Sequence, residues 1–389
     1  MLDRVRIHGF RSARDVTFAP GPLCALAGEA SSGKSTVLSA VWALLDASAP
    51  VPTLEDVSEG SGGRVHLEAD VGERTIFLDS RPPATLNLNR EGAPPTLFLP
   101  SGLRSTTIVA TPSTPAATKA ARVLLPEPGA PADGGLALVA GIDALCESRA
   151  AGLVVLLEEP ELYLSPQAQR HLYRLVRRLS EQGNQVLYST HAATFLSVDR
   201  LEELALVRHN KRLGTAVAQP APLSDRESFR AFAEFDAERA ELFLSRAALL
   251  VEGRTEKLAF PFVFEALGLD PDREAVAIVD CGGKGNLPLF ARICNECGIP
   301  YVVVHDRDAP RGRRPVESED VVNRRILETA GRRRTVQLTP DFEAVAGLRR
   351  GREKAQAAWR HFSGDGGSPE RVPKPLADAA RRVVSAARR

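Results

Sequence analysis

A glycine-rich nonapeptide, GEASSGKST at residues 28–36, constrains the fold of this 389-residue chain more than any other feature. It follows the apolar segment LCALA and precedes Thr36–Leu45, which is apolar at helical spacing. A strand, a glycine-rich turn and a helix in this order are typical of a parallel α/β sheet. Gly28 and Gly33 allow the backbone to curl so that its N–H groups face an anion. The sequence therefore predicts an α/β fold with a phosphate-binding turn.

The polar residues of this turn indicate which phosphate compound it binds. Lys34 is placed to reach the terminal phosphates of a nucleotide, and the hydroxyl of Ser35 is positioned for Mg²⁺. Thr36 follows at the start of the helix and belongs to the same set of cofactor-binding residues. We therefore interpret the segment as a P-loop that binds ATP and Mg²⁺.

Two later segments fit an ATPase. Leu153–Leu157 is a continuous apolar strand of the buried parallel type, and Glu158 and Glu159 follow it. Glu158 would orient Mg²⁺ and Glu159 would polarise the attacking water. His191 comes just after the next predicted strand, Gln185–Tyr188, where it would sense the γ-phosphate. For this histidine alone, a satisfied buried side chain is the simpler interpretation.

A second set of acidic residues lies far downstream, in LLVEGRTE (residues 249–256) and YVVVHDRD (residues 301–308). Three predicted strands alternate here with two predicted helices, which gives a parallel βαβαβ sheet; the segments are Ala248–Val251, Thr255–Leu267, Ala275–Asp280, Leu287–Cys297 and Tyr301–His305. Glu252, Asp306 and Asp308 then lie at carboxyl ends of strands, where such sheets bind ligands. Their oxygens suit Mg²⁺, Mn²⁺ or another divalent ion. The simpler alternative is an exposed turn and a charged loop without function.

Composition and charge divide the chain. We predict an ATPase domain over residues 1–222, a helical connection over 223–246 and a second domain over 247–389. Residues 307–389 hold 20 Lys and Arg against 11 Asp and Glu, although the net charge of the whole chain is only +1. A basic end suits a polyanion such as DNA, or else it is a solvated surface. No apolar run is long enough to span a membrane, and we expect a cytoplasmic protein without a membrane partner.

The first domain resembles the ABC-type ATPases, on the evidence of RIHGFRSARDVTF (residues 6–18), the P-loop and LLEEPE (residues 156–161). The resemblance implies a homodimer formed through the ATPase domains. Three departures stand out: Glu occupies position 158 where the family usually has Asp, residues 132–135 (ADGG) stand where its signature loop is expected, and residues 51–135 contain no glutamine.

The second domain resembles the Toprim domain of topoisomerases, primases and some nucleases. The match rests on Glu252, Gly253, Glu256 and the pair Asp306/Asp308, and on a glycine turn at residues 282–285. The resemblance implies that Glu252 is a metal ligand or general acid/base and that Asp306 and Asp308 are ligands. It makes Glu256 an outer support or a ligand of a second ion.

An ABC-type ATPase followed by Toprim resembles the overcoming-lysogenisation-defect (OLD) family of nucleases. The resemblance implies an ATP-binding, metal-dependent DNA endonuclease or nickase in phage defence or DNA repair. It adds Glu343 as a metal ligand and Lys374 as the cation near the scissile phosphate, with Lys354 as its rival. A partner protein is not indicated by the sequence.

Two other functions stay open. One is a regulatory DNA-binding ATPase whose Toprim domain does not cleave. The other is a topoisomerase- or primase-like enzyme, and the strand-passing type needs a nucleophilic tyrosine. Of the four tyrosines, Tyr163, Tyr173 and Tyr188 lie in the ATPase half and Tyr301 lies in a predicted core strand, which disfavours it.

Overall fold

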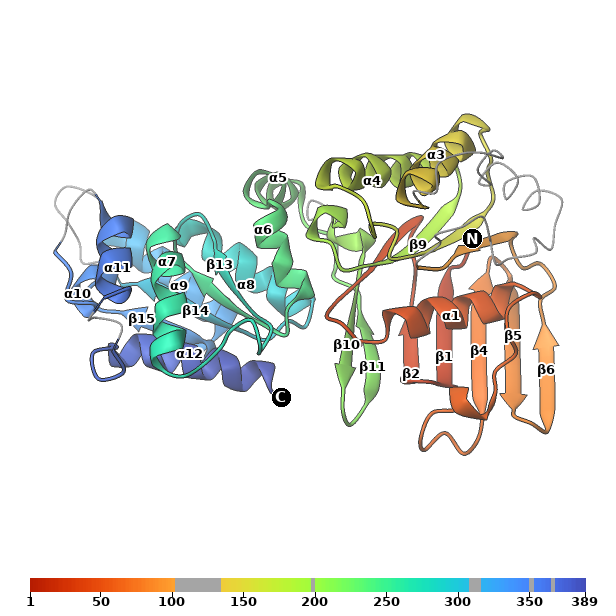
Figure 1. The fold of residues 1–389 in the computed structure, drawn as a ribbon, viewed down its shortest axis with the longest axis horizontal. Coiled ribbons are helices and arrows are strands. Elements are labelled where there is room, and N and C mark those ends of the chain that lie inside the picture. Colours follow the sequence, from red (N-terminus) through yellow and green to blue (C-terminus); the bar gives the residue numbers. More distant parts are fainter. Residues whose placement is uncertain (102–133, 197–199, 308–315, 350–352, 365–367) are drawn as a thin grey trace. The chain divides into compact units, whose positions relative to one another are not determined.

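The computed structural model describes residues 1–101, 134–196, 200–307, 316–349, 353–364 and 368–389. These residues form two compact units, Met1–Pro222 and Leu223–Arg389. Figure 1 shows an α/β arrangement in each unit, and each is described by itself below. Among the described residues, no helix combines the length and the apolar composition that a bilayer span requires.

Unit 1 contains an antiparallel sheet and a largely parallel sheet. The antiparallel sheet has the order β2-β1-β4-β5-β6; its strands are β1 (Arg4–Phe10), β2 (Ala13–Phe18), β4 (Val65–Val71), β5 (Arg74–Arg81) and β6 (Thr85–Asn89). The second sheet has the order β11-β10-β3-β9-β8-β7; its strands are β3 (Leu23–Ala27), β7 (Thr96–Leu99), β8 (Val154–Glu158), β9 (Gln185–Thr190), β10 (Leu204–Asn210) and β11 (Gly214–Ala218). Only β11 runs antiparallel to its neighbour in this second sheet.

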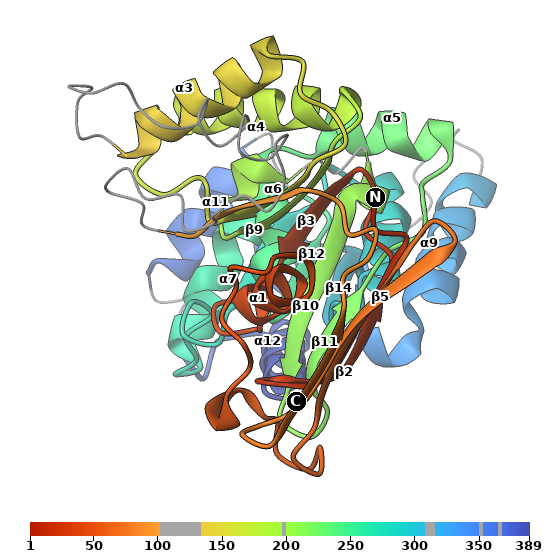
Figure 2. The same ribbon diagram turned by 90° about the vertical axis from the view of Figure 1, so that its right-hand side faces the viewer.

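Helix α1 (Lys34–Leu45) lies between the two sheets of unit 1 (Figure 2). One apolar core joins side chains of α1 to both sheets, including Val41 of the helix, Ile7 of β1 and Leu156 of β8. The helix is buried on most sides, as its apolar composition requires. The other helical elements of this unit are α3 (Gly134–Glu147), α4 (Pro166–Glu181), η1 (Leu54–Asp56), η2 (Ala193–Phe195) and η3 (Leu201–Glu203). The turn of residues 28–33 joins β3 to α1, and both of these elements belong to the core. The turn is therefore held at one end of the core.

Unit 2 is built on a four-stranded parallel sheet with the order β13-β12-β14-β15; the strands are β12 (Ala247–Val251), β13 (Val276–Asp280), β14 (Tyr301–Asp306) and β15 (Thr335–Leu338). Their side chains alternate between two buried faces, so the strands read as continuous apolar runs. Leu249 and Val304 face a core shared with α7 (Arg254–Ala266), α11 (Lys354–Phe362) and α12 (Lys374–Ala387). The opposite face packs against α8 (Leu287–Glu296), which itself contacts α9 (Val316–Ala330).

Short elements complete unit 2, and two of them surround the carboxyl edge of the sheet. They are α5 (Asp225–Glu234), α6 (Ala237–Ala240), α10 (Phe342–Val345), η4 (Glu241–Leu244), η5 (Lys284–Asn286) and η6 (Arg332–Arg334). Element η5 follows β13 and α10 follows β15, so both lie after a strand end. The segment 223–246, expected as a helical connection, consists of α5, α6 and η4.

Candidate functional site

The P-loop joins β3 to α1 through two glycines that no other residue can replace without a clash. Gly28 has φ +148°, and a Cβ atom there would lie 2.1 Å from the carbonyl oxygen of Val207. Gly33 has φ +103°, and its Cβ would lie 2.1 Å from Oγ1 of Thr215. Strands β10 and β11 therefore pack closely against the loop, and only glycine fits at these two positions of its backbone.

Lys34 is buried at the first residue of α1 and turns back over the loop. Its Nζ donates hydrogen bonds to the carbonyl oxygens of Gly28 at 2.9 Å and Glu29 at 2.7 Å. Burial lowers the pKa of Lys34 to about 8, against the opposing charges of Glu159, Glu161 and Glu29. A phosphate group bound in the loop would replace these carbonyl contacts with charge-assisted ones.

The two hydroxyl residues of the loop differ in exposure. Ser35 is exposed, so its hydroxyl is accessible to a ligand in the loop. Thr36 is half-buried and accepts a hydrogen bond from the Oγ of Ser12 at 3.2 Å. Ser12 in turn accepts one from Oγ1 of Thr215 at 2.8 Å. Ser12 and Thr215 were not predicted from the sequence, because one lies in the turn after β1 and the other on β11, far apart along the chain.

The predicted ATPase acids lie on the strands beside the P-loop. Glu158 ends β8, and its Oε2 accepts hydrogen bonds from the N–H and hydroxyl of Ser101 at 3.2 and 3.3 Å. Glu159 adopts φ +45°, and its N–H donates to the carbonyl oxygen of Ser189 on β9. Its Oε1 lies 3.4 Å from Nε2 of His191. Burial lowers the pKa of His191, and the charge of Lys34 adds to the effect while Glu159 opposes it. Lys34, Glu159 and His191 are therefore electrostatically coupled.

Glu161 is a further acid of this site that the sequence analysis overlooked. Its Oε1 accepts from Oγ1 of Thr190 and from the N–H of His191, both at 2.7 Å. Its Oε2 is buried and has no hydrogen-bond partner among the described residues. Burial raises the pKa of Glu161 above its ordinary value. Glu161 thus fixes the turn that carries His191. A third acid in EEPE (residues 158–161) was the signal available in the sequence.

In unit 2, Glu252 and Asp306 come together because their strands are neighbours. Glu252 directly follows β12 and Asp306 ends β14, and Val251 pairs with Val304 in the parallel register. The N–H of Asp306 donates to Oε2 of Glu252 at 3.3 Å. The structure thus brings together these two predicted metal-site residues from positions 54 residues apart. Asp308 lies outside the described residues.

Glu256 lies in the first turn of α7 and is 6% exposed. Its Oε2 accepts the N–H of Gly253 at 3.1 Å, which caps the helix. The pKa of Glu256 is raised to about 8, mainly by burial and in part by the charges of Asp306 and Glu252. Three carboxyl groups are therefore close enough to repel one another.

Glu343 approaches the same edge from the short helix α10. The N–H of the preceding residue, Phe342, donates to Oδ1 of Asp306 at 2.8 Å. Glu343 is 3% exposed, its Oε1 lies 2.6 Å from Nζ of Lys354, and its Oε2 has no hydrogen-bond partner among the described residues. The hydrogen bond to Glu343 raises the pKa of Lys354, and Asp306 and Asp341 contribute.

The two candidate lysines differ in position. Lys354 contacts Glu343, whereas Lys374 is exposed at the first residue of α12. The last turns of α12 line a pocket with the first residues of β14, so the helix runs against the strand direction. Lys374 therefore lies toward the carboxyl edge of the sheet, the edge that also carries Asp306.

The predicted glycine turn after β13 also lies beside Glu252. The N–H of Gly283 donates to the carbonyl oxygen of Glu252 at 2.7 Å. Gly282 has φ +71°, and a Cβ there would lie 2.6 Å from a carboxylate oxygen of Glu234. Lys284 is 8% exposed and donates to the carbonyl oxygen of Arg307 at 3.4 Å. The glycine turn was predicted from the sequence, but no role was predicted for Lys284.

The donor set at this edge fits a divalent cation. It offers oxygen atoms of carboxylates that repel one another, and one buried oxygen of Glu343 lacks a described hydrogen-bond partner. Hard cations such as Mg²⁺ bind this kind of donor. Within the described ranges, however, no three His, Cys, Asp or Glu side chains already form a group that could hold a metal ion. The described carboxylates lie near one another without the geometry of a complete metal-binding group.

Comparisons with known proteins match both units. Residues 243–308 match the family described as "Overcoming lysogenization defect protein-like, TOPRIM domain". Residues 125–197 match the one described as "AAA domain, putative AbiEii toxin, Type IV TA system". The OLD nuclease of Thermus scotoductus is 36% identical over 253 residues, which are 59% of this chain and 48% of that protein. The Old nuclease of Escherichia phage P2 is 29% identical over 172 residues, 42% of this chain and 29% of that protein.

Solved structures add little to these matches. The C-terminal region of the Xanthomonas campestris pv. campestris OLD protein aligns at 17% identity with a TM-score of 0.29, over 38% of this chain and 96% of that chain. The chain spans about half or less of the length of the two nucleases named above.

Unit 1 and unit 2 define the class: a P-loop ATPase unit followed by a Toprim unit with a parallel sheet. The chain is similar to the overcoming-lysogenisation-defect nucleases, as its sequence motifs indicated, and residues 243–308 match the Toprim domain model of that family.

Proposed function

We propose that this protein is an ATP-binding, divalent-metal-dependent DNA endonuclease or nickase. The observation that carries the proposal is the hydrogen bond between the N–H of Asp306 and Glu252, with Glu256 and Glu343 at the same strand edge. The two nuclease relatives support the reaction class. Because they are about twice as long as the matched segments or longer, the activity of the whole protein is part of the proposal.

At the carboxylate site, bound divalent ions supply Lewis acidity and a bound water of lowered pKa. Glu252 and Asp306 hold the ion, with Asp308 and Glu343 as further ligands, and Glu256 supports them from α7. Glu252 also serves as general acid/base. Lys354 or Lys374 provides the positive charge that stabilises the scissile phosphate. The contact between Lys354 and Glu343 favours Lys354 for this role.

In unit 1, the loop N–H groups and Lys34 bind the ATP phosphates, and Ser35 and Glu158 orient Mg²⁺. Glu159 polarises the attacking water. His191 lies 3.4 Å from Glu159, so it is placed to register whether the γ-phosphate is present. We propose that the ATPase units of two chains form a homodimer, and that the protein acts in phage defence or DNA repair.

A tyrosine nucleophile at the carboxylate site is disfavoured. All four tyrosines are described, and only Tyr301 belongs to unit 2. It is 2% exposed at the start of β14, whereas Asp306 ends the same strand. Within unit 2, therefore, no tyrosine lies beside these carboxylates, which disfavours a strand-passing topoisomerase. The regulatory ATPase with a non-cleaving Toprim domain remains the rival function.

Plasmid cleavage tests the proposal. Supercoiled plasmid is incubated with Mg²⁺ or Mn²⁺, with and without ATP, using wild type, Lys34→Ala and Asp306→Asn. Asp272→Asn is the matched control, because Asp272 is exposed and lies outside the cluster. We expect nicking by wild type and the control and its loss in Asp306→Asn. ATP turnover without nicking under every condition would favour the rival, and nicking by Asp306→Asn would place the chemistry elsewhere.

A second experiment tests the dimer. Glu159→Gln should slow hydrolysis and retain bound ATP, so light scattering should detect a dimer with ATP and a smaller species without it. A Glu159→Gln protein that stays monomeric with saturating ATP would contradict dimerisation through the ATPase units.

A further inference from the structure

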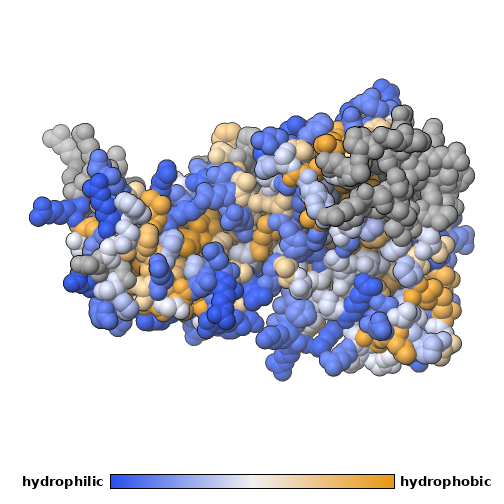
Figure 3. All heavy atoms as spheres, viewed as in Figure 1, coloured by the Kyte–Doolittle hydropathy of each residue, from blue (hydrophilic) through white to orange (hydrophobic). Residues whose placement is uncertain are grey.

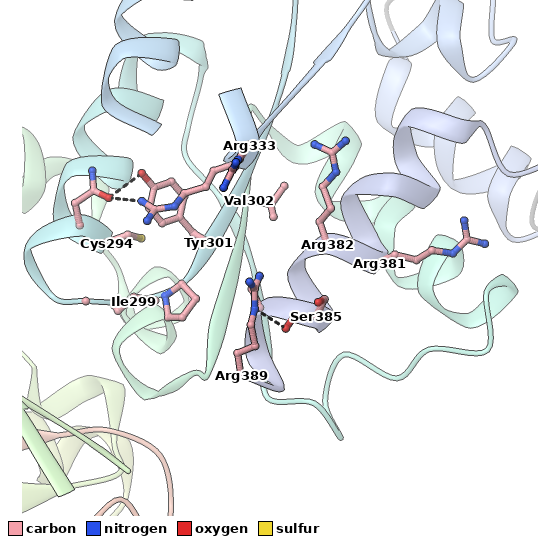
Figure 4. Close-up of a pocket in the computed structure, with 14 residues that line it drawn as sticks. Cys294, Ile299, Tyr301, Val302, Arg333, Arg381, Arg382, Ser385 and Arg389 are labelled. Carbon is pink, nitrogen blue, oxygen red and sulfur yellow. Dashed lines mark hydrogen bonds between the residues drawn. The ribbon is translucent and has the colours of Figure 1, made fainter. Parts of the chain in front are cut away.

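Unit 2 has a concave surface at the amino edge of its sheet, opposite the carboxylates. The hollow measures about 660 Å³ and is lined by the start of β14, the turn before β15 and the last turns of α12. Figure 4 shows these elements around it. We call this hollow the basic pocket, because five arginines line it and none of its lining residues is acidic; they are Arg333, Arg334, Arg381, Arg382 and Arg389.

The arginines of the basic pocket form no described ion pair with a carboxylate. Arg333, Arg381 and Arg382 are exposed. Five guanidinium groups without a described counter-ion create a positive potential, which a concave wall concentrates. Figure 3 shows a dense hydrophilic surface over the C-terminal end of α12. This clustering favours an anionic ligand.

One of these arginines is already held in place. Nη1 of Arg334 donates to Oδ1 of Asn295 at 2.7 Å, and its guanidinium stacks over the ring of Tyr301 at 5.0 Å from the centroid. The hydroxyl of Tyr301 donates to the same Asn295 oxygen at 3.0 Å. A guanidinium fixed in this way loses less conformational entropy when it binds a phosphate.

The pocket and the carboxylates occupy the two ends of one strand. Tyr301 starts β14 and Asp306 ends it, so five residue steps of about 3.3 Å separate the two edges by about 17 Å. Helix α12 connects the two edges, with Lys374 near one and Arg381 and Arg382 near the other.

We propose that the basic pocket binds backbone phosphates of nucleic acid whose scissile phosphodiester is held at the carboxylate edge. Arg381 and Arg382 contribute two contacts from α12, and Arg334 contributes a pre-oriented one. The contacts are to phosphates, so they position the duplex without reading its sequence. This inference rests on the proposed nuclease function and adds a second binding surface to it.

Salt-dependent DNA binding tests the basic pocket. Fluorescence anisotropy with a 30-base-pair duplex, in Ca²⁺ to limit cleavage, gives the slope of log Kd against log [NaCl]. For Arg381→Gln/Arg382→Gln we expect the slope to fall by about two and Kd to rise by roughly 10- to 100-fold at 100 mM NaCl. The matched control is Arg324→Gln/Arg325→Gln, an adjacent exposed pair on α9, which should leave both values unchanged.

Three other outcomes are decisive. If Arg381→Gln/Arg382→Gln keeps the wild-type slope and Kd, the inference is wrong while the nuclease function stands. If that variant binds DNA normally but inorganic phosphate or ATP binds the wild-type pocket and not the variant, the ligand is a small phosphate compound. If wild type binds no DNA and nicks no plasmid, the proposed function itself fails. Circular dichroism and thermal unfolding confirm that both double variants fold.

Discussion

The carboxyl group of Glu256 should destabilise the metal-free protein at neutral pH, and its removal should therefore stabilise it. Glu256 is 6% exposed, and its pKa is raised from 4.5 to about 8, first by burial. Between these two pH values the folded chain holds a proton that the unfolded chain has lost. The contribution of Glu256 to stability is therefore fully present below pH 4.5 and is lost progressively as pH rises to about 8.

The size of the effect follows from the shift. Each pH unit in this window costs about 1.4 kcal/mol, so the loss reaches about 3 kcal/mol at pH 7. Glu256→Gln keeps a carbonyl oxygen for the N–H of Gly253 and cannot ionise. We expect this variant to be more stable than wild type by about 3 kcal/mol at pH 7, with little difference at pH 4.5.

The measurement needs a signal from unit 2 alone. The chain has two tryptophans, Trp42 in unit 1 and Trp359 on α11, so a Trp42→Phe background leaves Trp359 as the reporter. Urea unfolding in EDTA is followed by its fluorescence from pH 5 to 9. The control is Glu265→Gln, an exposed glutamate on the same helix. Adding Mn²⁺ should stabilise wild type and reduce the advantage of Glu256→Gln.

One result would refute this reasoning. If the difference between Glu256→Gln and wild type in EDTA is small and independent of pH, burial does not hold the carboxyl group in its neutral form.

Three further predictions concern both sites. Gly28→Ala should weaken binding of a fluorescent ATP analogue at least about tenfold, because its Cβ would meet the carbonyl oxygen of Val207, while Gly21→Ala should not; equal affinities would contradict the steric argument. The lowered pKa of Lys34, about 8, predicts that ATP binding takes up close to one proton at pH 9 and none below pH 7. Calorimetry in buffers of different ionisation enthalpy measures the number of protons taken up. No uptake at pH 9 would show that Lys34 is already charged before ATP binds. Lys354→Met should lower the unfolding free energy by about 1–3 kcal/mol because it leaves Glu343 buried without its cation. The double variant Lys354→Met/Glu343→Gln should restore the unfolding free energy. A double variant as unstable as Lys354→Met would show that the ion pair does not stabilise the protein.

The sequence predicted the parts of the fold that depend on local pattern. The apolar runs at residues 153–157 and 301–305 are strands β8 and β14, with small shifts at their ends. Strand β2 was missed, because ARDVTF alternates too weakly to separate it from the preceding strand and turn. Strands β10 and β11 were also missed, yet Val207 and Thr215 on them shape the P-loop. Such contacts depend on strand order, which local patterns do not reveal.

The same limit applies to the sites. Glu252 and Asp306 were predictable because parallel strands end at one edge of a sheet. The contact of Lys354 with Glu343 was not predictable, since it depends on how α11 and α10 pack. The roles of Glu158, Glu159, His191 and the proposed metal ligands stay predictions, and Asp308 lies outside the described residues.

The hydrogen bond from Phe342 to Asp306 has a consequence for metal selectivity. Glu252 and Asp306 are attached to the two central strands of the sheet, whereas Glu343 belongs to a four-residue helix. Mg²⁺ needs oxygen ligands at about 2.1 Å and Ca²⁺ at about 2.3–2.6 Å. If Glu343 is a ligand as proposed, a larger ion would require α10 to move away from β14. The hydrogen bond from the N–H of Phe342 would oppose that movement and so favour the smaller ion.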